Sequence, residues 1–379
     1  MAASDLIAAA ELMDQFAQRT GLDSGTAPVR YLWTDAFAAC NFQYLAEAGA
    51  DARFDALAQR TVEQVHELLG HFRADDTRSG WLRGACGQAD GEHPTRAGLR
   101  IGKPLPERAS EQAFDERLEW ERDGQYFHYL TRWMRALEQL GRRRGEPHLT
   151  RWARELADTA HRAFTHAAGG GRKRMYWKMS TDLSRPLVPS MGQHDPLDGL
   201  VTALALRTDA TPEMDQAIAD YRVMMRESPL ATGDPLGLGS LLMDALRLEE
   251  LLRAGHGGHG PLLEHVLENA AASLPHLSLQ LGAPAELRLG FRELGLAIGL
   301  GGLKQLAVHL TEWPPTESRR MRPMLEALLT YLPLRQAIQA FWLDPVHRRS
   351  ASWREHRDIN EVMLATSLLA GTDGLWAWS

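Results

Sequence analysis

The sequence predicts an all-α fold in which six helical hairpins form a ring, with an inner circle of buried helices and an outer circle of amphipathic helices. Apolar residues recur at helical spacing over long segments. Valine and isoleucine are sparse, and no convincing run of alternating residues bounded by hairpin turns is present. Segments that are apolar on nearly every face alternate with amphipathic segments along the whole chain. A single domain over residues 1–379 is therefore expected.

The expected helices follow one another in pairs. The first is expected over residues 6–19, because Ser4 and Asp5 are capping residues that precede an apolar stripe. Residues 36–42 are expected to form a buried helix and residues 54–72 an amphipathic one. The same succession is expected for 126–140 with 149–167, 200–206 with 212–225, a helix ending near 253 with 261–274, and 295–303 with 321–331. The last buried helix, 362–369, has no following partner, and helix 6–19 is expected to supply it.

Small residues in the buried helices are expected to let these helices approach one another closely. They are Ala38, Ala39, Ala203, Gly237, Gly239, Gly295 and Gly299. Two of the buried helices also begin with the same Asp-Pro-Leu sequence, at Asp195 and at Asp234. An aspartate cap followed by proline at the first helical position explains both starts.

Composition and charge exclude several classes of function. A net charge of -7 and a pI near 6.1 provide no basic field for nucleic acid. No uncharged apolar run of about 18 residues is present, so no membrane span is expected. The two cysteines, Cys40 and Cys86, have a spacing that fits no zinc site, and neither a metal nor a cofactor is expected. Asp5, Glu11 and Asp14 interrupt any signal-peptide core, and a cytoplasmic location is expected.

Residues 117–130 form the most unusual stretch of the chain. They place three carboxylates, two arginines and several aromatic side chains at the start of a long apolar run. Buried charge costs several kcal/mol unless it is paired, so such a cluster either forms an ion network or lines a polar cleft. Because similar polar and aromatic residues recur where the other buried helices begin, we expect them to share one cavity at one end of the ring.

Several residues at these helix starts are candidates for a functional site. They are Trp33, Asp35, Glu119, Trp120, Glu121, Tyr126, His128, Trp177, His194, Asp195, Arg288, Arg292, Trp353 and His356. Aromatic faces stack on the C–H side of pyranose rings, while carboxylates, arginine and histidine satisfy hydroxyl groups. The mixture therefore predicts a site for a small-molecule or oligosaccharide substrate, in which the tryptophans, Tyr126, His128 and the two arginines bind.

Six pairs of buried and amphipathic helices, with Trp, Asp, Glu and His gathered where the inner helices begin, resemble the (α/α)6 toroid of the six-hairpin glycosidases. A related barrel occurs in sugar 2-epimerases of the N-acylglucosamine type. The resemblance covers nearly the whole chain and is architectural, so no catalytic residue is carried over from either family. It implies an (α/α)6 barrel and a carbohydrate-active enzyme.

Glycoside hydrolysis needs one protonated and one ionised carboxyl group. Glu119 is the candidate acid, Asp195 or Asp35 is the candidate base or nucleophile, and Glu121 lies on the same side as Glu119 if the chain is extended there. Helix capping is the alternative role for the aspartates, and Asp123 is expected to cap the helix that follows it. For Glu119 the alternative is an ion pair with a neighbouring arginine, Arg117 or Arg122.

Two other functions remain open at this point. A sugar epimerase or isomerase would use His194 and His356 as base and acid, since imidazole can do both near neutral pH. A non-catalytic binding or scaffolding barrel would instead have every carboxylate paired and no open cleft. The long segment 80–113 shows little helical periodicity, and it is expected to be either a functional lid or a solvated excursion.

Overall fold

The computed structural model describes residues 3–208, 211–226, 228–255, 258–371 and 375. The chain separates into two compact units. The first unit comprises Met1–Phe16, Tyr44–Ala52 and Pro229–Ser379. The second unit comprises Ala17–Gln43 and Arg53–Ser228. Helices account for most of the described residues in both units, which confirms the all-α prediction.

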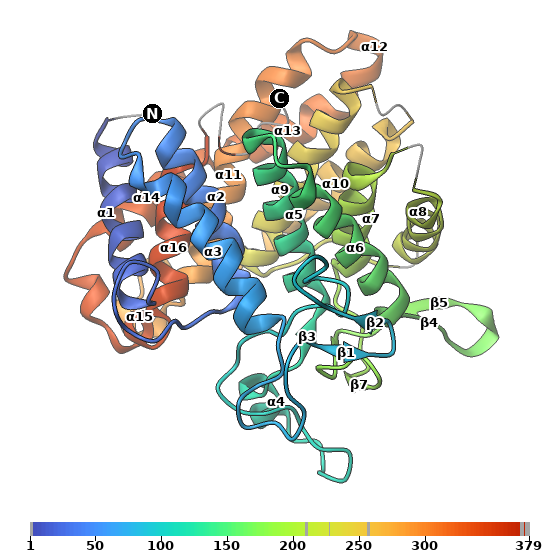
Figure 1. Ribbon diagram of the computed structural model, residues 1–379. Helices are drawn as coiled ribbons and strands as arrows, with labels where there is room; N and C mark the ends of the chain where they lie inside the picture. The colour runs from blue at the N-terminus through green and yellow to red at the C-terminus, as the bar shows by residue number, and fades with distance from the viewer. Residues whose placement is uncertain (1–2, 209–210, 227, 256–257, 372–374, 376–379) are drawn as a thin grey trace. The chain divides into compact units, whose positions relative to one another are not determined.

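The second unit is built on a row of long helices. They are the first part of α2 (Leu32–Glu47), α3 (Arg53–Leu69), α5 (Phe127–Arg144), α6 (Pro147–Phe164), α7 (Asp195–Leu206) and α8 (Pro212–Met225). Helix α5 packs against α6 and α7, and α7 packs against α8, as Figure 1 shows. Every residue of α7 is buried, whereas α6 and α8 each keep an exposed face. This is the predicted succession of buried and amphipathic helices.

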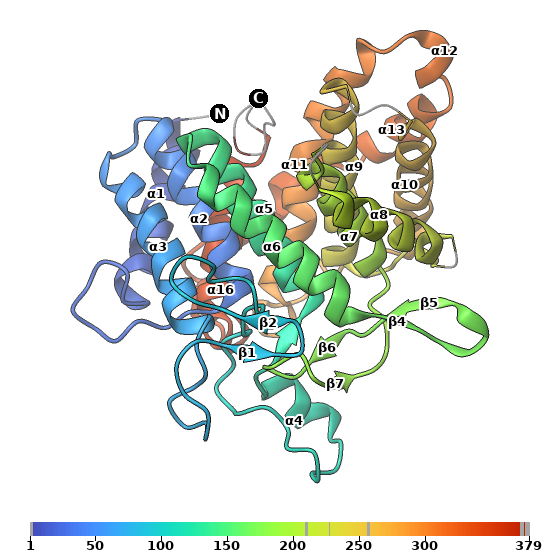
Figure 2. The same cartoon turned by 45° about the vertical axis from the view of Figure 1, so that its right-hand side comes forward.

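Short strands and one short helix gather at the end of the second unit where α5 begins (Figure 1). They are β1 (Arg83–Gly84), β2 (Gly87–Gln88), α4 (Glu116–Glu121), β3 (Gln125–Tyr126), β6 (Lys178–Met179) and β7 (Pro186–Val188). Strand β6 pairs antiparallel with both β3 and β7. Because β3 leads directly into α5, this small sheet fixes the residues at the start of that helix. A separate hairpin, β4 (Thr165–Ala167) with β5 (Lys173–Met175), projects beyond α6 in Figures 1 and 2.

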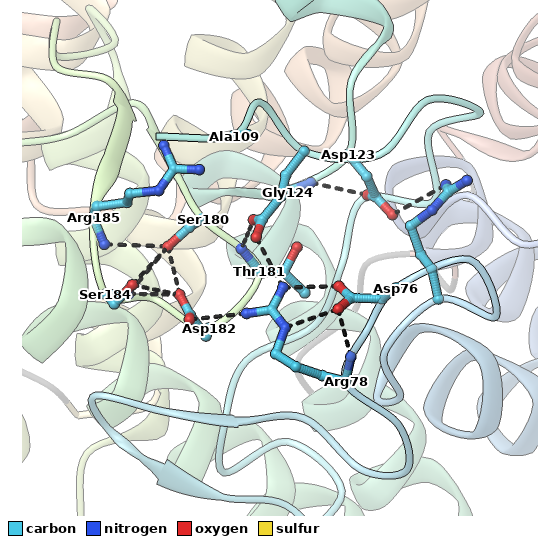
Figure 3. A network of polar contacts seen from close by, with 12 residues as sticks. Asp76, Arg78, Ala109, Asp123, Gly124, Ser180, Thr181, Asp182, Ser184 and Arg185 are labelled. Atoms are coloured by element: carbon cyan, nitrogen blue, oxygen red, sulfur yellow. Dashed lines mark hydrogen bonds and ion pairs between the residues drawn. The ribbon is translucent and has the colours of Figure 1, made fainter. Parts of the chain in front are cut away.

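The predicted lid segment, 80–113, is held in place by a polar network centred on Arg78. The guanidinium of Arg78 lies between the carboxylates of Asp76 and Asp182, 2.8 and 2.9 Å away (Figure 3). It also contacts Glu107 at 2.9 Å, and the other oxygen of Glu107 accepts a hydrogen bond from the Thr181 backbone N–H. Both ends of the segment are therefore attached to the β6–β7 loop. These bonds give the segment a fixed position beside the sheet.

The first unit contains most of α1 and the helices that follow residue 229. They are α1 (Ala3–Arg19), α9 (Pro235–Arg253), α10 (Gly260–Ser273), α11 (Gly290–Thr311), α12 (Pro315–Ser318), α13 (Met321–Leu329), α14 (Leu332–Leu343), α15 (Ala351–Glu355) and α16 (Arg357–Leu369). Helix α11 packs against α9, α14 and α16. Helix α10 packs against α9 and α13, as Figure 2 shows. In the described part of the chain α11 alone is long and apolar enough to cross a membrane, and 67% of its apolar window is buried within the protein.

Glycines bring α9 and α11 into backbone contact, as the sequence predicted. A Cβ atom added to Gly239 would lie 2.1 Å from the carbonyl oxygen of Gly295, and one added to Gly299 would lie 2.5 Å from the carbonyl oxygen of Gly239. Neither backbone oxygen can move without shifting a helix. The two helices can therefore be this close only because both positions lack a side chain.

Substitution of Gly239 by alanine is expected to lower the free energy of unfolding by about 1–3 kcal/mol or more, since overpacking forces the backbones apart. The measurement is chemical denaturation followed by circular dichroism. Gly260→Ala is the matched control, because an added Cβ there meets no atom within 4 Å. Equal stability of the two variants would show that the α9–α11 contact is looser than described.

Three local predictions fail for identifiable reasons. Helix α14 was not expected, because residues 332–343 begin with Leu-Pro-Leu and carry no side-chain cap. Asp123 does not cap α5; it is buried and binds Arg100 at 2.5 Å. Asp234 caps α9 as expected, accepting from the Gly237 N–H at 3.0 Å. Asp195, by contrast, is the first residue of α7, and the residue before it, His194, occupies the cap position.

Candidate active site

A cluster of aromatic side chains lies where α5 begins. The ring of Tyr126 packs against Tyr129, Trp177 and Trp120, with centroids 5.2, 5.5 and 6.4 Å away. Trp120 meets Trp177 edge to face at 5.0 Å and is 43% exposed. The hydroxyls of Tyr31 and Tyr129 are hydrogen-bonded at 2.5 Å. These contacts join α2, α4, α5 and the β6 strand into one wall that runs from the interior to the surface.

His128 and Asp195 meet at the inner part of this cluster. The His128 ring lies 5.4 Å from Tyr126 and is stacked on Trp177 at 6.1 Å. Its Nδ1 atom is 4.0 Å from Oδ1 of Asp195, which is too long for a hydrogen bond. In the described part of the chain neither His128 Nδ1 nor Asp195 Oδ2 has a hydrogen-bond partner, although both atoms are buried. Each of these two titratable groups therefore keeps one buried polar atom without a hydrogen bond.

The surroundings of Asp195 favour its protonated form. Burial raises the pKa of this carboxyl to about 8, the negative charge of Asp198 adds to the increase, and Gly192 and Arg132 oppose it only in part. Burial together with Arg132 lowers the pKa of His128 to about 3. At neutral pH the site thus contains a protonated carboxylic acid beside a neutral imidazole. A buried acid of this kind can donate a proton where an ordinary aspartate would already be ionised.

Asp198 lies one helical turn after Asp195 and has a different environment. Its carboxylate is 3.2 Å from Arg132 and 3.4 Å from Arg135, both on α5. Two aspartates in the first turn of α7 therefore have contrasting partners, since one is held by arginines and the other faces the aromatic cluster. This contrast between neighbouring carboxyl groups is typical of sites that use one of them as an acid.

Glu119 is bound on both carboxylate oxygens. Its Oε1 atom is 2.9 Å from the Lys178 ammonium and its Oε2 atom is 3.0 Å from the Arg108 guanidinium. Glu119 and Lys178 are both almost completely buried, and Lys178 also donates to the backbone oxygens of Glu119 and Arg122. The predicted ion pair with Arg117 or Arg122 is thus replaced by one with Lys178 and Arg108. This network positions α4 on the sheet.

Glu121 has the opposite character. It ends α4, is exposed, and its carboxylate makes no hydrogen bond or ion pair with any described residue. Its negative charge adds to the effect of burial in raising the pKa of the Tyr31 and Tyr126 hydroxyls, and it opposes the burial that lowers the pKa of the Lys103 ammonium, so it lies in the neighbourhood of the aromatic cluster. The ammonium of Lys103 lies 5.4 Å from the centroid of the Tyr31 ring. The segment 80–113 therefore contributes a cation beside this open carboxylate.

The remaining candidates of the second unit lie around this cluster. Trp33 is buried in the first turn of α2 and lies 6.4 Å from Tyr129. Asp35 is also buried, lies 3.0 Å from Arg30, and accepts a hydrogen bond from the Tyr31 backbone N–H. His194 is partly exposed at the start of α7, directly before Asp195. Asp35 thus orders the start of α2.

Four candidates belong to the first unit. Arg288 is buried, forms two hydrogen bonds with Glu293, and lies 3.6 Å from the centroid of the Phe341 ring. Trp353 is also buried and stacks on Trp342 at 5.1 Å. Arg292 binds Asp234 at 2.7 Å near the surface, and His356 meets Phe291 edge to face at 5.4 Å. Arg288 and Trp353 are therefore part of the packed interior of their unit.

The candidate residues predicted from the sequence omit three members of the site. Tyr31 and Tyr129 connect α2 to α5, and Lys103 comes from the middle of the long loop. The spacing of Tyr126 and Tyr129, three residues apart at a helix start, is a signal for a shared face. The hydroxyl contact across 98 residues has no local signal at all.

Comparison with known proteins shows the fold. No protein-family model matches the sequence, and neither does any curated protein. The chain is similar to the α-1,6-mannanase GH76A from Salegentibacter sp. HEL1_6, with a TM-score of 0.53 and 11% identity over 97% of this chain and 100% of that one. An inactive variant of the same mannanase, bound to α-1,6-mannotriose, gives a TM-score of 0.54 and 11% identity over 97% and 99% of the chains.

A third similar structure is the cellobiose 2-epimerase from Spirochaeta thermophila DSM 6192, with 14% identity, a TM-score of 0.48 and coverage of 90% and 87%. The two mannanase structures extend over almost the whole of this chain. They confirm the fold predicted from the succession of helices. The protein has the (α/α)6-barrel fold.

Proposed function

We propose that this protein is a carbohydrate-active enzyme, and specifically a glycoside hydrolase in which Asp195 is the general acid. The observation that carries the proposal is the buried carboxyl of Asp195, with a pKa near 8 and an oxygen without a hydrogen-bond partner among the described residues. It faces an aromatic cluster that reaches the surface at Trp120. A scaffolding barrel would need no acid of this kind, because an unsatisfied buried carboxyl only costs stability.

Hydrolysis of a glycosidic bond also needs an ionised carboxylate to activate water or to attack the sugar. Glu121 is the second carboxyl that we assign, because it is open to solvent and close enough to Tyr31 and Tyr126 for its charge to raise the pKa of both hydroxyls. Glu119 is less suited to this role, since Lys178 and Arg108 occupy both of its oxygens. In the proposed mechanism Asp195 protonates the leaving oxygen. The Glu121 carboxylate either takes a proton from the attacking water or itself attacks the anomeric carbon.

The aromatic wall supports a sugar as the substrate. Trp120 is 43% exposed and Trp177 is partly exposed, and both rings pack against the buried ring of Tyr126. Such faces bind the C–H side of a pyranose, and the hydroxyl groups of that ring would meet Glu121 and Lys103. Since the mannanase shares only the fold with this chain, α-1,6-mannotriose is the first member of a substrate panel rather than its only one.

Replacement of Glu121 by glutamine is expected to lower kcat at least about 100-fold, because the amide can neither activate water nor attack carbon. The assay measures release of reducing sugar from α-1,6-mannotriose and from β- and α-linked trisaccharides of glucose, mannose and xylose. Glu116→Gln is the control, since Glu116 is an exposed carboxylate at the other end of the same short helix. A Glu121 variant with the activity of the control would exclude this carboxylate from the reaction.

A sugar epimerase or isomerase is the second candidate. The observation that favours it is the neutral ring of His128, whose Nδ1 faces Asp195 without a hydrogen bond. His194 and His356, the pair predicted from the sequence for this chemistry, belong to different units. The same panel incubated in D2O separates the two reactions. Deuterium at C2 of the recovered sugar would identify the epimerase, whereas hydrolysis leaves that carbon unlabelled.

A further inference from the structure

The second unit contains a cavity that shares no residue with the candidate active site. Its volume is about 550 Å³, and it lies between α3, the last turns of α5, the beginning of α6 and the long loop. His66, Trp81, Leu140 and Trp152 are among its lining residues. Leu140 and Tyr129 are eleven residues apart on α5, which corresponds to roughly 16 Å along the helix. The cavity and the candidate active site therefore use opposite ends of the same helix.

His66 provides a buried hydrogen-bond donor in this cavity. The indole N–H of Trp133 is 3.1 Å from Nε2 of His66, and because an indole can only donate, Nε2 must be the acceptor. A neutral imidazole then carries its proton on Nδ1. The residue is 5% exposed, and burial keeps the ring neutral by lowering its pKa to about 3. No described residue accepts a hydrogen bond from Nδ1, so this N–H is left for a ligand.

Two tryptophans form fixed walls of the cavity. One face of Trp81 is covered by His71, with ring centroids 4.0 Å apart. Trp152 donates its indole N–H to the Glu92 carbonyl at 2.8 Å and is flanked edge to face by His66 at 5.0 Å. Both rings remain partly exposed. Aromatic surfaces that are oriented in advance bind a flat apolar face without losing side-chain freedom.

Two exposed carboxylates of α3 and one arginine are among the lining residues of the cavity. The arginine, Arg144, is already paired with two other carboxylates. Glu63 and Glu67 lie one turn apart on the exposed face of α3, and neither forms an ion pair with a described residue. Ionised carboxylates only accept hydrogen bonds, so they favour a ligand with several donors and repel anions. An organic cation would satisfy these carboxylates, but it offers no acceptor to the N–H of His66. A hydroxyl group satisfies both, because it donates and accepts.

We propose that this cavity is a second carbohydrate-binding site, which holds a neutral saccharide outside the active site. The C–H face of a pyranose would stack on Trp81 or Trp152, a ring or hydroxyl oxygen would accept from His66 Nδ1, and outer hydroxyls would donate to Glu63 and Glu67. The assignment rests on this cavity alone and does not depend on the proposed catalysis. The volume accommodates more than one sugar ring.

The test is a titration of the full chain with mannotriose, cellotriose, maltotriose and chitotriose, followed by the indole N–H signals of Trp81 and Trp152 in NMR spectra. Each signal is assigned by its Trp→Phe substitution. At least one trisaccharide is expected to shift both signals saturably. In Trp152→Ala the affinity measured at Trp81 is expected to fall at least about tenfold, which corresponds to loss of one aromatic contact. If Trp152→Ala does not fold, the affinity is measured instead from the Trp152 signal in the Trp81→Ala variant.

Trp120→Ala is the control, because that residue belongs to the other site and its loss should leave the Trp81 and Trp152 titration unchanged. Turnover is measured separately, and Trp152→Ala should keep the kcat of the unmodified chain, so failure of the binding site and failure of the catalytic proposal give different results. The proposal is overturned if none of the four trisaccharides shifts either signal, if the affinity survives in both Trp→Ala variants, or if choline shifts both signals while the saccharides do not.

Discussion

Substitution of Asp195 by asparagine is expected to lower kcat by about 10³-fold, because the amide cannot protonate the leaving oxygen. The unmodified enzyme should lose activity above about pH 8, where the buried acid ionises, and the fall should be close to tenfold for each further pH unit. Asparagine has nearly the same volume, so binding of the substrate should persist. The measurement is kcat and kcat/KM between about pH 5 and pH 10.

Asp215→Asn is the control for this substitution, since Asp215 is an exposed aspartate on α8 of the same unit. If Asp195→Asn kept more than about a tenth of the activity, the acid would have to be another group. The same conclusion would follow if the residual activity of Asp195→Asn still fell above about pH 8 as it does in the unmodified enzyme. Either result would leave the fold unaffected and would redirect attention to His128.

The same variant tests the carboxyl without a substrate. The folded state binds the proton of Asp195 more tightly than the unfolded chain does, because the pKa rises from 3.8 to about 8 on folding. Below pH 3.8 this proton contributes several kcal/mol to the free energy of unfolding. The contribution falls as the pH rises from 3.8 to about 8 and is then lost. The difference in unfolding free energy between the two proteins should therefore change with pH in this window. His66 and His128 have the opposite dependence, but they are common to both proteins.

Removal of the Lys178 side chain is expected to cost about 3–5 kcal/mol of unfolding free energy, because it leaves the buried Glu119 carboxylate with Arg108 as its one remaining cation. Lys178 is fully buried and donates three hydrogen bonds, to Glu119 twice and to the Arg122 carbonyl. Chemical denaturation of Lys178→Ala measures the loss. The double variant Lys178→Met with Glu119→Leu should recover most of it, since it removes both buried charges.

An exposed ion pair provides the comparison. Arg162 and Asp158 lie one turn apart on α6 at 3.3 Å, and Arg162 is 53% exposed. Arg162→Ala should change the unfolding free energy by at most about 1 kcal/mol. If Lys178→Ala were as mild as this control, the Glu119 network would not hold α4 in place. Catalytic measurements on Glu119 variants would then need a different interpretation.

Helix periodicity gave most of the fold because burial of one face repeats at a fixed spacing. The prediction for residues 212–225 coincides with α8, and 261–274 differs from α10 by one residue at each end. Contacts that join distant residues have no such local signal. Glu119 meets Lys178 across 59 positions, and Asp123 meets Arg100 across 23, so the partners of both carboxylates were missed. The seven strands described here have only two or three residues, which is too short for an alternating pattern.

The candidate site was found in part for the same reason. Trp120, Tyr126, His128 and Asp195 are predicted as site residues because each precedes or begins a buried helix, and they lie near one another within the second unit. The sequence ranked Glu119 first, whereas its burial between two cations makes it the least available carboxyl of α4. Which of several neighbouring carboxyl groups stays unpaired depends on the whole packing arrangement, and one sequence does not contain that information in local form.

The attachment of the long loop through Arg78 has a consequence for how ligands would be selected. A segment of more than thirty residues that had to become ordered on binding would subtract that entropy from every affinity. Here the ordering is already provided by Asp76, Glu107 and Asp182, so Lys103 occupies its place beside Tyr31 before any ligand arrives. A preorganised wall of this kind binds ligands whose shape already fits it, because it does not rearrange on binding. It therefore favours fast association with a few ligands over binding of many different ones.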